Sequence, residues 1–157
     1  MRGINLPEQA HYVNVLPPVD ITGGKVGAEF HMKNHSKANI MVQIGVSAAA
    51  PTAILVKECS NAAGDNAVAI GFDYYAEETA DGDTLSAKQT ATASGITPSA
   101  NNGIMYIIVI DASQLSATKP WIQVSFTNGT NSVIASISAV LTGARYAEAA
   151  STLTAIA

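Results

Sequence analysis

The sequence predicts an all-β protein, an antiparallel β-sandwich of the group that includes the jelly rolls. Seven or eight stretches alternate between apolar and polar residues, which is the period of a strand that buries one face. Clusters of Gly, Pro, Asn, Asp and Ser separate these stretches, and no stretch has a sustained helical period. Two antiparallel sheets packed face to face would bury such strands, and 157 residues are enough for one domain of this kind.

One stretch, residues 104–111, is expected to be the central strand. Its odd-numbered and even-numbered positions are both apolar, and many of these residues are β-branched. The turn residues Asn102 and Gly103 precede it. A run of seven apolar residues is too short to cross a membrane as a helix. Because both faces of the strand are apolar, we expect other parts of the chain to cover it on both sides.

The remaining strands are expected on either side of this one. In chain order they are residues 26–32, 38–46, 52–59, 67–76, 120–127 and 132–142. Each alternates along its length, and in residues 38–46 the inward side chains are expected to be those of Ile40, Val42, Ile44 and Val46. Turn clusters such as residues 60–66 and 128–131 join the strands.

We expect an extended N-terminal arm (residues 1–23), a sandwich domain (residues 24–143) and a C-terminal tail (residues 144–157). Three prolines in the arm leave room only for a short edge strand at residues 12–16. The Ala-rich tail could form a short helix, which is marginal when isolated. The two ends carry side chains that they cannot bury locally, so both are expected to order against neighbouring subunits. These side chains belong to Ile4, Leu6, Arg145, Tyr146, Leu153 and Ile156.

A long loop is expected inside the domain, at residues 77–102, where no period is sustained. Loops of this length in compact domains are usually functional or disordered, and Leu85 and Ile96 are the only large aliphatic residues in this one. Its acidic start contains Glu77, Glu78, Asp81 and Asp83. Such a run can supply oxygen ligands to a cation, but the EF-hand spacing and its closing Glu are missing. A cation site and a solvated acidic loop both remain open.

The charge content limits the function classes. Only 13% of the residues are Asp, Glu, Lys or Arg, which is about half the usual share in soluble domains. A weakly charged surface is easily desolvated, as in a protein that is buried in an assembly, although a surface merely rich in Ala and Thr would look the same. The net charge of −4 argues against a nucleic-acid partner. No secretory signal or membrane helix is expected, so we expect a protein made in a cytoplasm.

No residue is expected to be catalytic, to bind a cofactor or to ligate a metal, and the protein is not expected to be an enzyme. The motifs of a nucleophile elbow and of a phosphate-binding loop are missing, while a glycosidase carboxylate pair cannot be judged from sequence. Cys59 lies in a strand-like run, where a small buried side chain is expected. His31 and His35 are expected to face solvent at a strand edge, because two imidazoles alone do not make a zinc site.

Five segments carry a resemblance to a known class of protein. They are residues 16–21 (LPPVDI), 30–45 (FHMKNHSKANIMVQIG), 54–61 (ILVKECSN), 69–75 (AIGFDYY) and 143–146 (GARY). Their order and content resemble small structural proteins of tailed bacteriophages that are encoded beside the major capsid protein. The resemblance covers most of residues 16–146 and rests on strands, turns and an aromatic close, with no catalytic signature.

This resemblance implies a virion component that is assembled in the host cytoplasm, a head decoration (cement) protein on the outside of the capsid. Its expected partners are the major capsid protein and its own copies, as a homotrimer by analogy. The contact residues expected from the sequence are Ile4, Leu6, Leu85, Ile96, Arg145 and Tyr146.

Two alternatives remain open. Within the virion, the protein could instead belong to the collar, the head–tail connector or the tail. From another class, a host-surface or carbohydrate-binding sandwich would need exposed aromatic side chains, for which the candidates are Tyr74, Tyr75, Tyr106 and Trp121.

Overall fold

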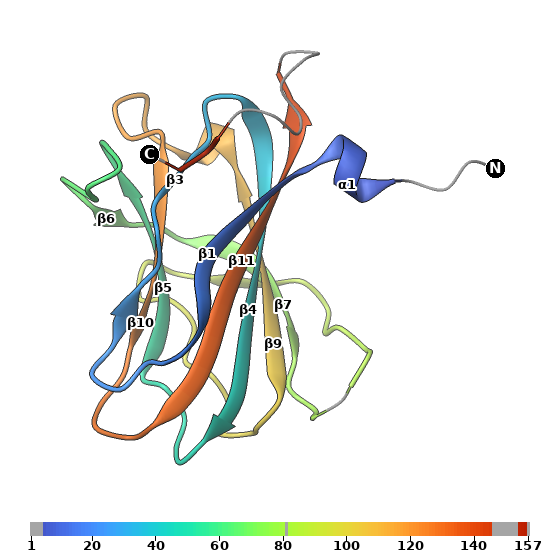
Figure 1. The fold of residues 1–157 in the computed structure, drawn as a ribbon, viewed down its shortest axis with the longest axis vertical. Helices are drawn as coiled ribbons and strands as arrows, with labels where there is room; N and C mark the ends of the chain where they lie inside the picture. Colours follow the sequence, from blue (N-terminus) through green and yellow to red (C-terminus); the bar gives the residue numbers. More distant parts are fainter. Residues whose placement is uncertain (1–4, 81, 146–153, 157) are drawn as a thin grey trace.

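The computed structural model describes residues 5–80, 82–145 and 154–156, and two antiparallel β-sheets packed face to face make up the fold (Figure 1). The predicted all-β sandwich is therefore confirmed. The larger sheet has the order β1 (His11–Asp20), β11 (Val133–Ala144), β4 (His35–Ser47), β9 (Ile104–Asp111), β7 (Phe72–Glu77) and β8 (Gln89–Ala91). The smaller sheet has the order β2 (Lys25–Val26), β10 (Trp121–Thr127), β5 (Ala53–Cys59) and β6 (Val68–Ala69), and β3 (Phe30–His31) also pairs with β10. The short helices are α1 (Leu6–Gln9) and the 3-10 turn η1 (Ala112–Gln114).

Strand β9 lies inside the larger sheet, hydrogen-bonded to β4 on one side and to β7 on the other. Its even-numbered residues, which include Tyr106, are fully buried between the sheets, while Met105, Ile107 and Val109 point to the other face and are half-buried. The expectation that both faces of this strand would be covered is wrong for the described chain. The outward residues are apolar even though no described element packs over them.

Two predicted strands are each interrupted, residues 26–32 within the smaller sheet and residues 67–76 where the chain passes from the smaller sheet to the larger one. Residues 26–32 form β2 and β3, with the intervening Gly27 N–H donating to Val124 O at 2.9 Å and the Ala28 N–H donating to Val15 O at 2.8 Å. A side chain at Gly27 would collide with that of Val15, so the two sheets can close together here only around a glycine. Residues 67–76 likewise divide into β6 of the smaller sheet and β7 of the larger one.

The predicted arm is mostly part of the sandwich. Strand β1 pairs with β11 and continues through Pro17 and Pro18 to Asp20, with irregular register on the way. Prolines are tolerated because β1 is an edge strand, where one row of N–H groups has no sheet partner. Of the described arm residues, 5–10 precede β1 and 21–23 follow it, and α1 contains no buried residue.

The long loop of residues 77–102 is tied to both sheets. Strand β8 forms within it and pairs with β7, and farther on Ile96 and Ile54 exchange backbone hydrogen bonds of 3.0 and 2.9 Å, which attach the loop to β5. The buried Tyr106 hydroxyl donates to Glu78 Oε1 at 2.6 Å and accepts from the Ser99 N–H at 3.0 Å. The loop is therefore an ordered connection between the sheets.

The described end of the tail packs on its own domain. Ala155 is buried, its carbonyl accepts a hydrogen bond of 2.9 Å from the His31 N–H, and Ile156 packs against the core. This contact corrects the expectation that Ile156 would order against a neighbouring subunit. Leu153 and Tyr146 lie outside the described residues. None of the described helices is both long and apolar enough to span a membrane.

Candidate protein interaction surface

The outward side of the larger sheet is the most distinctive surface of the described chain, and we call it the outer face. It consists of the uncharged outward residues of five neighbouring strands: Tyr12, Asn14, Asn39, Met41, Gln43, Tyr75, Met105, Ile107, Val109, Ser136, Ser138 and Val140. The charged residues of the same parity border this set, Lys37 and Asp111 at one end of β4 and β9 and Asp73 and Glu77 on β7. The outer face is therefore a broad uncharged surface on a rigid sheet.

Strand register makes the outer face continuous. One row across the sheet runs Asn14, Ser138, Met41, Ile107 and Tyr75. Directly opposite side chains in neighbouring strands lie about 4.5–5.5 Å apart, so the apolar members of a row shield one another. This mutual cover explains why Met41 and Ile107 are only half-exposed although no described element lies over them.

Charged residues lie at the margin of the outer face. Lys37 and Asp111 are opposite each other at the end of the sheet where β4 begins. On β7, Asp73 accepts hydrogen bonds from Thr90 Oγ1 at 2.7 Å and Lys88 Nζ at 3.1 Å, which hold the pKa of Asp73 below its usual value. These charges lie at the rim and leave the centre free of ions.

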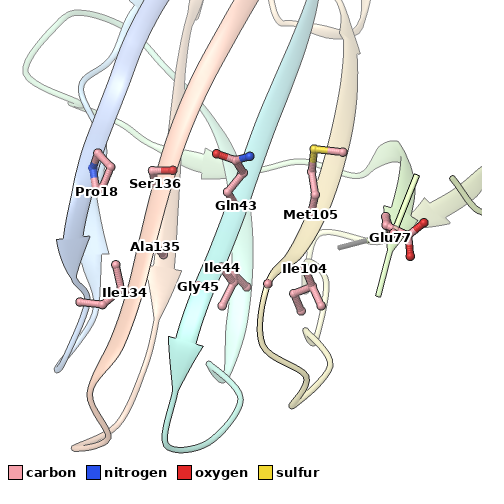
Figure 2. Close-up of a pocket in the computed structure, with 12 residues that line it drawn as sticks. Pro18, Gln43, Ile44, Gly45, Glu77, Ile104, Met105, Ile134, Ala135 and Ser136 are labelled. Carbon is pink, nitrogen blue, oxygen red and sulfur yellow. The ribbon is translucent and has the colours of Figure 1, made fainter. Parts of the chain in front are cut away.

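A shallow groove of about 390 Å³ lies at the other end of the outer face, where β4 ends (Figure 2). Pro18, Ser136, Gln43 and Met105 form a row across four strands in this view, and Ile134 lies farther toward the strand ends. Glycines at positions 45, 82 and 103 also line the groove, and their lack of side chains keeps it open.

Glu77 forms one side of the groove and organises the acidic loop. Its carboxylate accepts hydrogen bonds from the N–H groups of Thr79 at 2.8 Å and Thr84 at 2.7 Å, one on each oxygen, and these bonds lower the pKa of Glu77. Asp81 lies outside the described residues, so the open question of a cation at this loop is not settled. Among the residues that are described, no group of three or more His, Cys, Asp or Glu side chains is arranged to hold a metal ion.

The other buried carboxylate, Glu58, also has a structural role. Its two oxygens accept hydrogen bonds from the Ser116 N–H at 2.8 Å and from Ser116 Oγ at 2.7 Å, and Lys119 Nζ lies 3.9 Å away. Neither Glu58 nor Glu77 has an oxygen without a partner, which is poor geometry for general acid or base chemistry.

The histidines differ from expectation. The His31 ring contacts Trp121 with ring centroids 4.8 Å apart and ring planes tilted by 53°. His35 is buried and not solvent-facing, because it lies beneath the start of β1, where the His11 ring stacks on it at 5.7 Å. Neither His35 ring nitrogen has a hydrogen-bond partner among the described residues, and burial lowers the pKa of His35. Cys59 is buried, as predicted, and burial raises the pKa of its thiol.

The predicted contact residues do not form one site. Leu6 and Leu85 are exposed, on α1 and on the long loop. Arg145 is exposed beyond the end of β11, and its N–H donates to Asn34 O at 2.9 Å. Ile96 is a correction: it is 5% exposed and belongs to the core, because its pairing with Ile54 draws it between the sheets. Ile4 and Tyr146 lie outside the described residues.

The aromatic candidates for a sugar platform are mostly occupied. Tyr106 is buried, Tyr74 packs against the core and donates its hydroxyl hydrogen bond to Gln89, and Trp121 is covered by His31. Tyr75 is half-buried on the outer face. An exposed aromatic that sequence reasoning passed over is Tyr12, at the margin of the same face.

The outer face itself was also missed from the sequence. The signal for it in the sequence was that the odd-numbered residues Met105, Ile107 and Val109 are apolar, and that the outward-facing Met41 of residues 38–46 is apolar too. Comparison of the chain with models of protein families and with curated protein sequences finds no match.

Proposed function

We propose that this protein is a non-enzymatic structural protein of a tailed-phage virion, which binds the major capsid protein lattice on the outside of the head and stabilises it. The observation that supports this proposal is the outer face, a rigid surface of uncharged side chains with charges confined to its rim. Such a surface can be desolvated without stranding a charge. Its low charge agrees with the composition of the whole chain.

The mechanism would be mechanical. A decoration protein that touches two neighbouring capsomers buries surface on both, so separating the capsomers requires those patches to be exposed again. The size of the outer face sets how strong one contact can be. Five strands about 4.8 Å apart and three residue rows of about 6.8 Å give roughly 500 Å². A stable pairwise interface uses about 800 Å² per partner, so the outer face alone would bind weakly and many copies would have to act together.

The collar, connector and tail positions would use the same surface with a different partner and remain alternatives. A carbohydrate-binding role is less well supported, because its aromatic candidates are buried, stacked or half-covered. An enzymatic role has no supporting arrangement among the described residues.

The proposal is tested by adding purified protein to heads that lack it. Sedimentation and image averaging of the heads should detect bound protein, and the loaded heads should survive higher temperature. Asn14→Lys places a charge on the outer face at an exposed position and should abolish binding. Thr127→Lys, at an exposed position of the smaller sheet, is the matched control and should bind normally. Equal binding by the two variants, or no binding by the wild-type protein, would contradict the proposal.

A further inference from the structure

We propose that the N-terminal segment of one copy, residues 1–8, docks in the groove at the end of the outer face of a second copy. The groove is the one lined by Pro18, Gln43, Met105, Ile134 and Ser136. This inference deepens the proposed function and rests on it for the setting, because it names the contact that would join neighbouring copies on a lattice.

The described part of the segment, residues 5–8, is exposed on its own domain. No residue of α1 is buried, and Leu6 is 48% exposed although it is a large aliphatic residue. Ile4 and Pro7 make the segment more apolar still. An apolar chain end with no local cover is suited to binding a partner surface.

Distance keeps Leu6 from the groove of its own copy. His11 pairs with Leu141, and the groove residues Ser136 and Ile134 lie five and seven residues away along β11, which corresponds to about 17 and 23 Å. With α1 folded, the chain from His11 back to Leu6 spans at most about 11 Å. Figure 1 shows α1 at the upper end of the sheet, whereas the groove lies toward the lower ends of the strands. The groove within reach is therefore that of another copy.

The groove matches the segment in shape and polarity. Pro18, Ile134 and Met105 supply apolar walls for aliphatic side chains. The Gln43 amide and the Ser136 hydroxyl make no side-chain hydrogen bond to another described residue, so both are available to the backbone of a docked peptide.

The first residues of the segment and the acidic end of the groove carry opposite charges, whereas Glu8 lies at the other end of the segment. Glu77 lines the groove, and Glu78 and Asp83 follow it on the adjacent loop. Arg2 is the only Lys or Arg among the first 24 residues. A docked segment would bring Arg2 near this acidic end, which contributes orientation more than affinity because an exposed ion pair is weak.

The expected affinity between free copies is low. Burying Ile4 and Leu6 is favourable, but ordering the segment costs conformational entropy of comparable size. Docking should therefore be transient in dilute solution and persistent where a lattice holds copies side by side at high effective concentration. A method that traps brief encounters is the appropriate test.

Disulfide trapping between two separate chains provides that test without any capsid. Chains carrying Leu6→Cys are mixed with chains carrying Ile134→Cys under mild oxidation, and the native Cys59 stays in place because it is buried. The control partner carries Val68→Cys, at a similarly exposed position of the smaller sheet. We expect the Leu6–Ile134 heterodimer to form about tenfold faster than the Leu6–Val68 heterodimer, because docking raises the local concentration of the thiols.

Two results would overturn the inference. One is equal trapping rates with the two partners. The other is rapid trapping within a single dilute chain that carries both Leu6→Cys and Ile134→Cys, which would mean that the segment folds onto its own sheet. Because no capsid is present, failure here leaves capsid binding untouched, and failure of capsid binding leaves this measurement unchanged.

Discussion

Replacing Tyr106 by Phe should loosen the long loop without disturbing the core. The Tyr106 ring is fully buried, and its hydroxyl joins Glu78 at 2.6 Å to the backbone of Ser99 at 3.0 Å. Burial and the Glu78 carboxylate raise the pKa of Tyr106 above its ordinary value, so the hydroxyl remains a donor throughout the neutral range. The substitution removes this one group and keeps the ring.

The cost can be estimated from the two bonds. A hydrogen bond to a charged group contributes about 1.5–3 kcal/mol, and a buried N–H left without an acceptor costs about 1–3 kcal/mol. Glu78 is exposed and can be rehydrated, which reduces the first contribution. We expect the free energy of unfolding to fall by about 2–3 kcal/mol, which lowers the Tm of a domain of this size by about 5–10 °C.

Calorimetry and amide hydrogen exchange provide the measurement. Exchange should accelerate at residues 99–101 more than in β9, because the loop loses its anchor while the strand keeps its ladder. Tyr75→Phe is the matched control: it removes a hydroxyl that makes no hydrogen bond to a described residue, so its effect should stay within about 0.5 kcal/mol. If Tyr106→Phe and Tyr75→Phe have the same Tm, the Tyr106 hydroxyl does not hold the loop.

Three further outcomes are expected. Burial and the neighbouring His11 lower the pKa of His35 from its ordinary value of 6.5, so below that pH the unfolded chain binds more protons than the folded protein. The free energy of unfolding should therefore fall as the pH drops from about 6.5 to 5. In His35→Phe, chemical denaturation should show a smaller change over the same pH range. Gly95→Ala should cost more than about 2 kcal/mol by chemical denaturation, because φ is +80° and the new Cβ would collide with Ile54 O. Deleting residues 154–157 should lower the Tm by several degrees, since Ala155 and its hydrogen bond to β3 are lost, whereas deleting residues 1–8 should leave the Tm unchanged.

The sandwich could be predicted because a period of two is visible wherever one face of a strand is buried. The same signal could not reveal where the chain changes sheets. Apolar and polar residues keep alternating through Gly71, where the chain passes from β6 to β7, and only the pairing of the two strands with different neighbours distinguishes this change from a continuous strand. His35 was misjudged for a similar reason, because its burial depends on a ring 24 positions away in the chain, that of His11.

The outer face illustrates a different limit. An apolar run such as residues 104–111 has the same pattern whether a second layer of the same chain or a separate partner covers its outward side. The structure removes the first possibility for the described residues, since Met105, Ile107 and Val109 remain half-exposed. Whether a partner covers them is therefore a question of assembly, which the pattern of one chain does not answer.

The two proposed contacts support each other quantitatively. The outer face, at roughly 500 Å², is too small to hold a partner tightly alone, and the docked segment gains little beyond the entropy it loses. When both act on the same lattice, the second contact forms within an assembly that already holds the two copies at millimolar effective concentration, so docking is more populated there than between free copies. Removing residues 1–8 should therefore weaken lattice binding far more than it weakens any measured contact between free copies. Equal losses in the two measurements would mean that the contacts act independently.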